Sequence, residues 1–176
     1  MEGVVFGAVV LLAMWLLGRS MDKKLRSREG VSGAQSVGRD PEAVARILVA
    51  NLNRIKIDMK AMSRLPARAS AQYVEESYLA LACAQLLAID RTVKRLDIRG
   101  PLIGHYKKLF PPKMAERFEA YKLAYTQKMD ITPAFAASLG LVGHEVLAVN
   151  LSALQSHFKD TLLSATKELH GLGFAA

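Results

Sequence analysis

The feature that most constrains the fold of this chain is an uninterrupted apolar stretch near its N-terminus. Residues 3–17 read GVVFGAVVLLAMWLL and carry no charge. At about 1.5 Å per residue, a helix over this stretch just crosses a hydrocarbon core of about 30 Å when its ends reach the headgroups. A helix that is apolar on every side needs lipid or a large protein around it. We therefore predict a single-pass transmembrane anchor at residues 1–18.

Two other interpretations of the stretch agree less well with its surroundings. A cleaved signal peptide carries positive charge before its apolar run, whereas here Glu2 precedes the run and basic residues follow it. A buried core helix would need more protein around it than the 136 residues after Asp40 provide. The anchor residues that we single out are Gly3, Phe6, Gly7, Leu11, Trp15 and Leu17.

The charges beside the stretch predict its orientation. Residues 19–28 contain five Lys and Arg and a single acid, Asp22. Lys and Arg resist translocation, so we expect a short N-terminus outside and the C-terminal region in the cytoplasm, as in a bacterial inner membrane. Gly3 and Gly7 form a GxxxG spacing through which two anchor helices could associate. The flanking cations are Arg19, Lys23, Lys24, Arg26 and Arg28.

The rest of the chain divides into a linker and one domain. Residues 19–40 hold three glycines and four serines among alternating charges, a composition typical of a basic, flexible juxtamembrane linker. Residues 41–176 carry eighteen Lys and Arg against twelve Asp and Glu. A basic domain attracts phosphate groups, and an anionic membrane leaflet next to the anchor is a sufficient reason for that charge.

The single cysteine limits the chemistry of the domain. Cys83 can form no intramolecular disulfide and no zinc site of several cysteines. It lies in the apolar sequence LALACAQLLAI, which indicates a small buried residue and not a nucleophile.

Apolar periodicity predicts an all-α domain, a compact bundle of about four helices. No segment alternates with the period of a strand. Gly140 and Gly143 leave open a kink or break in the last helix, and Gly171 is placed to end it, with Leu172 as the accompanying apolar contact. The expected helices cover residues 42–65, 70–97, 113–130 and 134–170, with an irregular connector at 102–112.

Two polar features stand out as candidate sites. Lys56, Lys60 and Arg64 form a row spaced by four on the predicted helix 42–65, with Arg68 just beyond it. The row could face an acidic partner or lipid headgroups, and it could equally be a solvated surface. Apart from this row, His144 and Glu145 form a polar pair in an apolar segment, where a buried structural pair is favoured over a proton-handling site.

A second membrane span over residues 135–154 is disfavoured because His144, Glu145 and Asn150 would be costly in lipid.

Catalytic and ligand motifs are missing from the sequence. There is no inward-facing Glu-x-x-His pair, no phosphate-binding glycine loop and no GxSxG. Adjacent Glu75 and Glu76 suggest ordinary exposed acids. We predict no catalytic residue, no metal site and no cofactor.

These features together predict a non-enzymatic, single-pass membrane subunit. Its cytoplasmic bundle would dock onto other proteins of a larger membrane assembly for secretion, transport or motility. The alternative is a tethered basic binder of anionic lipid or nucleic acid, although no reading helix supports nucleic acid. A third hypothesis, an enzyme or ligand-binding bundle, would centre on His144 and Glu145.

Overall fold

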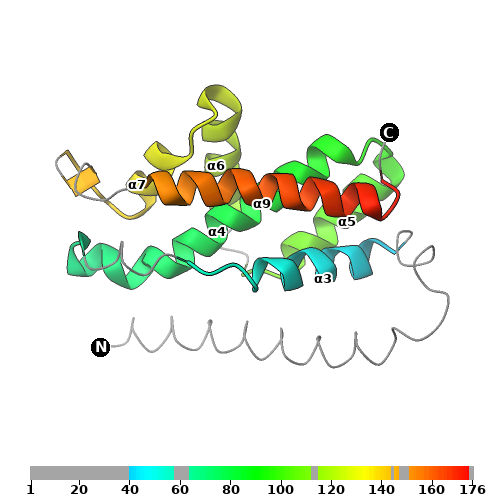
Figure 1. Ribbon diagram of the computed structural model, residues 1–176, viewed down its shortest axis with the longest axis horizontal. Helices are drawn as coiled ribbons and strands as arrows, with labels where there is room; N and C mark the ends of the chain where they lie inside the picture. The colour runs from blue at the N-terminus through cyan, green and yellow to red at the C-terminus, as the bar shows by residue number, and fades with distance from the viewer. Residues whose placement is uncertain (1–39, 58–63, 112–114, 144, 147–150, 175–176) are drawn as a thin grey trace.

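The structure is a computed structural model that describes residues 40–57, 64–111, 115–143, 145–146 and 151–174. The regular structure in these ranges is entirely helical, which confirms the all-α class (Figure 1). Six helices are present there, more than the four expected, because two of the expected helices are divided differently. They are α3 (Pro41–Leu52), α4 (Ala67–Thr92), α5 (Leu96–Lys108), α6 (Ala115–Lys128), α7 (Thr132–Ser138) and α9 (Ser152–Gly171).

The longest described helix, α4, is the centre of the bundle. It contacts each of the other five described helices, and every residue from Leu79 to Ile89 is buried. Four alanines in this stretch allow neighbouring helices to approach closely on different sides. A helix buried on all sides belongs in the middle of its domain, and the remaining helices are arranged around it.

The first described helix begins as its sequence predicts but ends early. The Glu42 N–H donates to the Asp40 carboxylate at 2.9 Å, and Pro41 occupies the first turn. The helix α3 ends at Leu52 instead of residue 65. Ile55 and Ile57 then both pack against the core from a non-helical segment. Two residues apart on a helix they would face in nearly opposite directions, so this packing requires an extended chain.

The second expected helix, 70–97, is wrong at its C-terminal end. The helix α4 ends at Thr92, Val93 is extended, and α5 occupies most of the expected connector at 102–112. Leu96, an apolar residue within the expected helix, is 69% exposed. Pro101 lies inside α5 and removes one backbone hydrogen bond from it. Burial of Leu102 and Tyr106, four residues apart, stabilises the helix in spite of that loss.

The third helix agrees with its prediction. The helix α6 covers Ala115–Lys128 and buries Phe118, Tyr121 and Tyr125 along one face. Met129, within the expected range of this helix, is 54% exposed, and its φ of 55° places it in the left-handed region just after α6.

The last expected helix, 134–170, is broken, as its glycines left open. The helix α7 ends before Gly140, whose φ is +64°. The Gly140 N–H donates to Ala137 O and the Leu141 N–H donates to Ala136 O, the two bonds of a Schellman end. Leu141 is buried beneath this turn.

The helix α9 ends with the same motif, two residues later than expected. Gly171 remains helical, whereas Gly173 has a φ of +85°. The Gly173 N–H donates to His170 O and the Phe174 N–H donates to Leu169 O, each at 3.0 Å. Phe174, not Leu172, supplies the buried apolar contact.

The predicted anchor at residues 1–18, its basic flank and the linker up to residue 39 lie outside the described residues. Among the helices that the structure describes, none is long and apolar enough to cross a bilayer.

Candidate functional site

An open groove runs between α3 and α9. Both helices pack on α4 and lie side by side on the face shown in Figure 1. The groove has a volume of about 200 Å³, with α4 as its floor. Its lining residues are Leu48, Asn51, Ile55, Gln85, His157, Asp160, Thr161, Ser164 and Ala165. This groove is our candidate site.

The floor of the groove is polar, and both polar atoms of its Gln85 side chain are hydrogen-bonded. The Gln85 side chain is 2% exposed. Its amide nitrogen donates to Leu48 O at 2.7 Å, and its amide oxygen accepts from the Tyr106 hydroxyl at 2.6 Å. Gln85 therefore ties α3 and α5 to α4, because a buried amide is costly when its bonds are lost.

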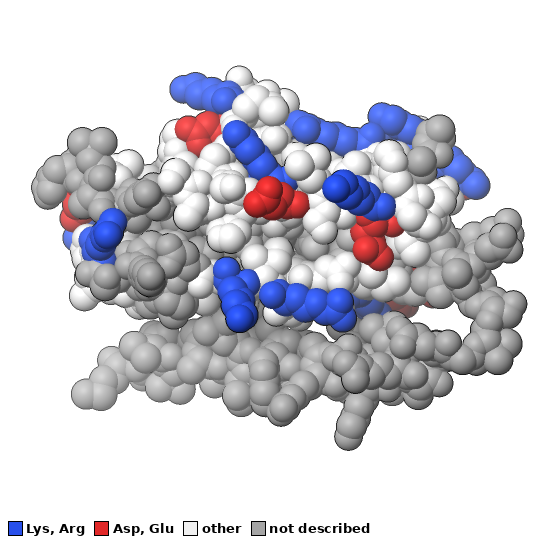
Figure 2. All heavy atoms as spheres, viewed as in Figure 1, with Lys and Arg blue, Asp and Glu red and all other residues white. Residues whose placement is uncertain are grey.

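The walls of the groove combine apolar and polar side chains, and one lining residue, Asp160, is acidic. Leu48 and Ile55 contribute apolar surface from the α3 side and Ala165 contributes it from α9. Exposed Asp160 belongs to the α9 wall. Exposed Lys56 follows Ile55 in the sequence and lines a separate, smaller hollow that shares His157 with the groove. Figure 2 shows the mostly uncharged band between the charges over α9 and the Lys and Arg side chains below them.

A buried carboxylate on α4 is the strongest polar feature that sequence reasoning missed. Glu76, expected to be an exposed acid, has no exposed surface. Its Oε1 is ion-paired with Arg117, whose side chain is 42% exposed. Its Oε2 accepts from the Tyr121 hydroxyl at 3.0 Å, and that hydroxyl lies 3.0 Å from Ser138 Oγ. Burial raises the pKa of Tyr121 to about 12.

The Glu76 cluster joins three helices of the bundle. Glu76 lies on α4, its two partners on α6 and Ser138 on α7. The sequence offered one usable indication, since Glu76 falls three residues before Leu79 on the side of α4 that also carries Tyr73 and Ala80. Tyr73 and Ala80 are buried.

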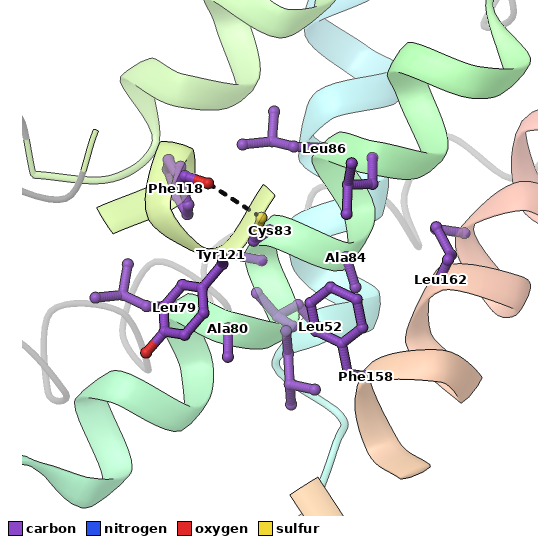
Figure 3. Packing of buried hydrophobic residues seen from close by; sticks show 14 of the residues in the cluster. Leu52, Leu79, Ala80, Cys83, Ala84, Leu86, Phe118, Tyr121, Phe158 and Leu162 are labelled. Atoms are coloured by element: carbon purple, nitrogen blue, oxygen red, sulfur yellow. Dashed lines mark hydrogen bonds between the residues drawn. The ribbon is translucent and has the colours of Figure 1, made fainter. Parts of the chain in front are cut away.

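Cys83 is the small buried residue that its sequence context indicates. It has no exposed surface, and its thiol donates to Phe118 O at 3.4 Å (Figure 3). Burial is the main cause that raises the pKa of Cys83 to about 12. A thiol with such a pKa stays protonated at neutral pH and is a poor nucleophile.

The predicted basic row does not form on one helix. Lys56 lies four residues beyond the end of α3, and Lys60 lies outside the described residues. Arg64 is exposed just before α4. Arg68 lies in α4 and donates to the Glu145 carboxylate, with a shortest distance of 2.7 Å. The row was predicted from a helix over 42–65, and the helix α3 is too short to carry it.

The polar pair His144 and Glu145 is described only in part. His144 lies outside the described residues. The Glu145 side chain, 17% exposed, is ion-paired with Arg68 and accepts from the Val142 N–H at 3.1 Å. This pairing holds the loop after α7 against the start of α4.

Acidic, histidine and cysteine side chains do not gather into a metal-binding group of three or more anywhere in the described ranges. Comparison with known proteins found no matching family model, no matching curated protein and no matching solved structure.

Proposed function

We propose that this chain is a membrane-tethered docking subunit. In this proposal residues 1–18 anchor it, residues 19–40 act as a tether, and the helical bundle binds another protein of a membrane-associated assembly, of the secretion, transport or motility type. The observation that carries the proposal is the open groove between α3 and α9. The apolar N-terminal stretch and its basic flank support the membrane location.

The lining of the groove favours the binding of another protein over catalysis. Its apolar walls offer contact area, and the polar atoms of Gln85 at its floor already have partners. Protein interfaces combine an apolar centre with a polar rim, and the groove has both. Its dimensions suit the side chains of another protein.

Fractionation of cells expressing the full chain tests the proposal. We expect the chain in the membrane fraction, with its C-terminal region protected from a protease added outside, and we expect it to co-purify with other membrane proteins. Leu11→Arg places a charge in the anchor and should move the chain to the soluble fraction, whereas Leu11→Ala should not. Recovery of the unaltered chain in the soluble fraction, or as a monomer without partners after extraction, contradicts the proposal.

A second candidate function is a tethered binder of anionic lipid. Exposed cations Arg54, Lys56 and Arg64 all lie in the stretch between α3 and α4, and such cations attract an anionic leaflet. Flotation with vesicles of anionic or neutral lipid, using the full chain and the Lys56→Ala/Arg64→Ala variant, tests this candidate. Equal recovery of both forms with anionic vesicles excludes a role for these charges.

A further inference from the structure

The turn between α4 and α5 gathers positive charge on the surface of the bundle. We infer that this turn rests on an anionic lipid leaflet, with its cations against the lipid phosphates and Leu96 inserted between the headgroups. The inference rests on the membrane anchor of the proposed function and names a further contact with the same membrane. We call this surface the basic corner, and its cations are Arg91, Lys94, Arg95, Arg99 and Lys122.

Contacts between three helices hold the basic corner together. Arg99 on α5 lies 3.8 Å from the Asp90 carboxylate on α4, and the Lys122 ammonium on α6 lies 3.5 Å from the same carboxylate. The Arg91 guanidinium on α4 lies 5.3 Å from the centre of the Tyr125 ring on α6. The cations of these helices therefore belong to one patch of surface.

The basic corner keeps an excess of positive charge. Its two acids are Asp90 and Asp97, and Asp97 pairs with Arg95 at 2.6 Å within the turn. The described residues as a whole carry sixteen Lys and Arg against twelve Asp and Glu. Five cations against two acids give the basic corner three of those four surplus charges. Figure 2 shows Lys and Arg side chains along the upper right of the molecule, where α4 meets α5 in Figure 1.

Leu96 is the most exposed large apolar side chain in the described ranges, at 69%. It is the first residue of α5, and residues 94–97 are all exposed, so the turn protrudes from the bundle. A single exposed leucine needs no explanation, but this one follows two exposed cations directly. The headgroup region accepts such a combination, because the apolar side chain reaches the acyl boundary while the cations stay with the phosphates.

The predicted anchor keeps the basic corner within reach of a leaflet. A flexible coil as long as the predicted linker, residues 19–40, spans about 25 Å, and a bundle of 136 residues has a radius of gyration of about 14 Å. The helix α3, which follows the linker, begins toward the same end of the long axis as α5 (Figure 1). The bundle can therefore turn this corner to the membrane, and attraction to anionic headgroups selects it over less positive surfaces.

Other acidic partners match the basic corner less completely. The phosphate backbone of a nucleic acid pairs with cations but offers no apolar environment to Leu96. An acidic protein would have to be recruited, whereas the predicted anchor supplies the leaflet at all times. Anionic lipid satisfies the charge and the exposed leucine together.

Fluorescence quenching of a label at position 96 tests the inference. The full chain is reconstituted in lipid nanodiscs, either of neutral phosphatidylcholine alone or of phosphatidylcholine mixed with anionic phosphatidylserine. Leu96→Cys carries an apolar, thiol-linked fluorophore. Leu163→Cys, at a position 59% exposed on α9, carries the same fluorophore as the control. Both chains also carry Cys83→Ala, so that each has a single labelling site.

We expect dissolved acrylamide to quench the label at position 96 about threefold less in anionic discs than in neutral discs, because the cations draw it into the headgroup region. The label at position 163 should be quenched equally in both. High salt should remove the protection at position 96, since it screens the attraction of exposed charges.

Removal of cations should act only at the basic corner. Lys94→Ala/Arg95→Ala should abolish the protection of the label at position 96 in anionic discs. Lys159→Ala/Lys167→Ala, which removes two exposed cations of α9 instead, should preserve it.

Other outcomes overturn the inference. These are equal quenching at position 96 in the two kinds of disc, equal protection at positions 96 and 163, or protection at position 96 by added duplex DNA and not by anionic lipid. Failure of the anchor is distinguishable, because size-exclusion chromatography then shows that the chain does not enter neutral discs. A chain that enters the discs without protection at position 96 refutes the basic corner alone.

Discussion

Glu76 carries a carboxylate that water does not reach, and its charge is compensated by one arginine. Arg117 reaches it from α6 with a side chain that remains 42% exposed. The Tyr121 hydroxyl supplies the hydrogen bond to the other carboxylate oxygen. A buried ion pair adds little stability compared with an apolar replacement, but removing one partner is costly. Substitutions that remove one partner or both partners of this pair should therefore differ in how much they lower the free energy of unfolding.

We expect Arg117→Met to lower the free energy of unfolding by about 3 kcal/mol, because it leaves a buried charge without a cation. The double variant Glu76→Gln/Arg117→Met should recover part of that loss, since the amide is neutral and can still accept from Tyr121. Urea denaturation of the full chain in detergent measures the unaltered chain, Glu76→Gln, Arg117→Met and the double variant. Simple addition of the two single effects would show that the pair is not coupled.

Cys83 should be inert in the folded chain. Its pKa of about 12 and its lack of exposed surface predict that a thiol reagent at pH 8 reacts with it only as fast as the protein opens. Reaction followed by absorbance, with and without urea, measures this. Rapid labelling of the native chain would contradict its burial against Phe118.

The raised pKa of Cys83 also predicts a pH dependence. The ordinary thiol pKa is about 8.5, so between about pH 9 and 12 the unfolded chain has lost a proton that the folded chain keeps. Folding stability is then fully present below about pH 9 and falls as the pH rises toward 12. Cys83→Ala should make the decline less steep at pH 9 to 10, as measured by urea denaturation at each pH.

At the scale of elements, the ends of the helices are defined by backbone conformation. Gly140 and Gly173 both have positive φ, and each is followed by a buried apolar residue. The two Schellman ends therefore contribute to the core as well as terminating α7 and α9. The sequence predicted Gly171 as the residue that ends α9. Gly171 and Gly173 both lie near the last apolar positions of that helix, so the sequence does not distinguish them.

Substitution of the two C-terminal glycines should have opposite effects. Gly173→Ala forces a side chain into the left-handed region and should cost about 1–2 kcal/mol of unfolding free energy. Gly171→Ala lies within the helix with open space around an added Cβ, and should stabilise the chain by about 0.4–1 kcal/mol. The denaturant midpoints of the two variants measure these effects. A lower midpoint for both variants would contradict the end of α9 at Gly171.

At the scale of the whole molecule, α4 is the element on which stability depends, because every other described helix contacts it. Ala84 has no exposed surface, whereas Ala71, on the same helix, is exposed. Ala84→Leu should lower the free energy of unfolding by about 1–3 kcal/mol through overpacking. Ala71→Leu should change it by less than about 0.5 kcal/mol. Hydrogen exchange should show that the loss in Ala84→Leu extends to all helices packed on α4, and a loss confined to one neighbour would contradict its central role.

The sequence by itself determined the helical class and most of the buried positions. Val44, Leu48 and Leu52, like Phe118, Tyr121 and Tyr125, are buried as their periodicity predicts, because one apolar face per helix is a local property of the chain. The burial of Cys83 followed from its apolar neighbours for the same reason.

Only the tertiary structure decided where helices stop and which polar groups are enclosed. The extended packing of Ile55 and Ile57, the short α3 and the helix through Pro101 depend on contacts with distant segments. The same is true of Glu76, which is paired from α6, and of the groove, which exists because α3 and α9 pack on α4 with space left between them. Neighbours in space set these features, and periodicity along one helix carries no information about them.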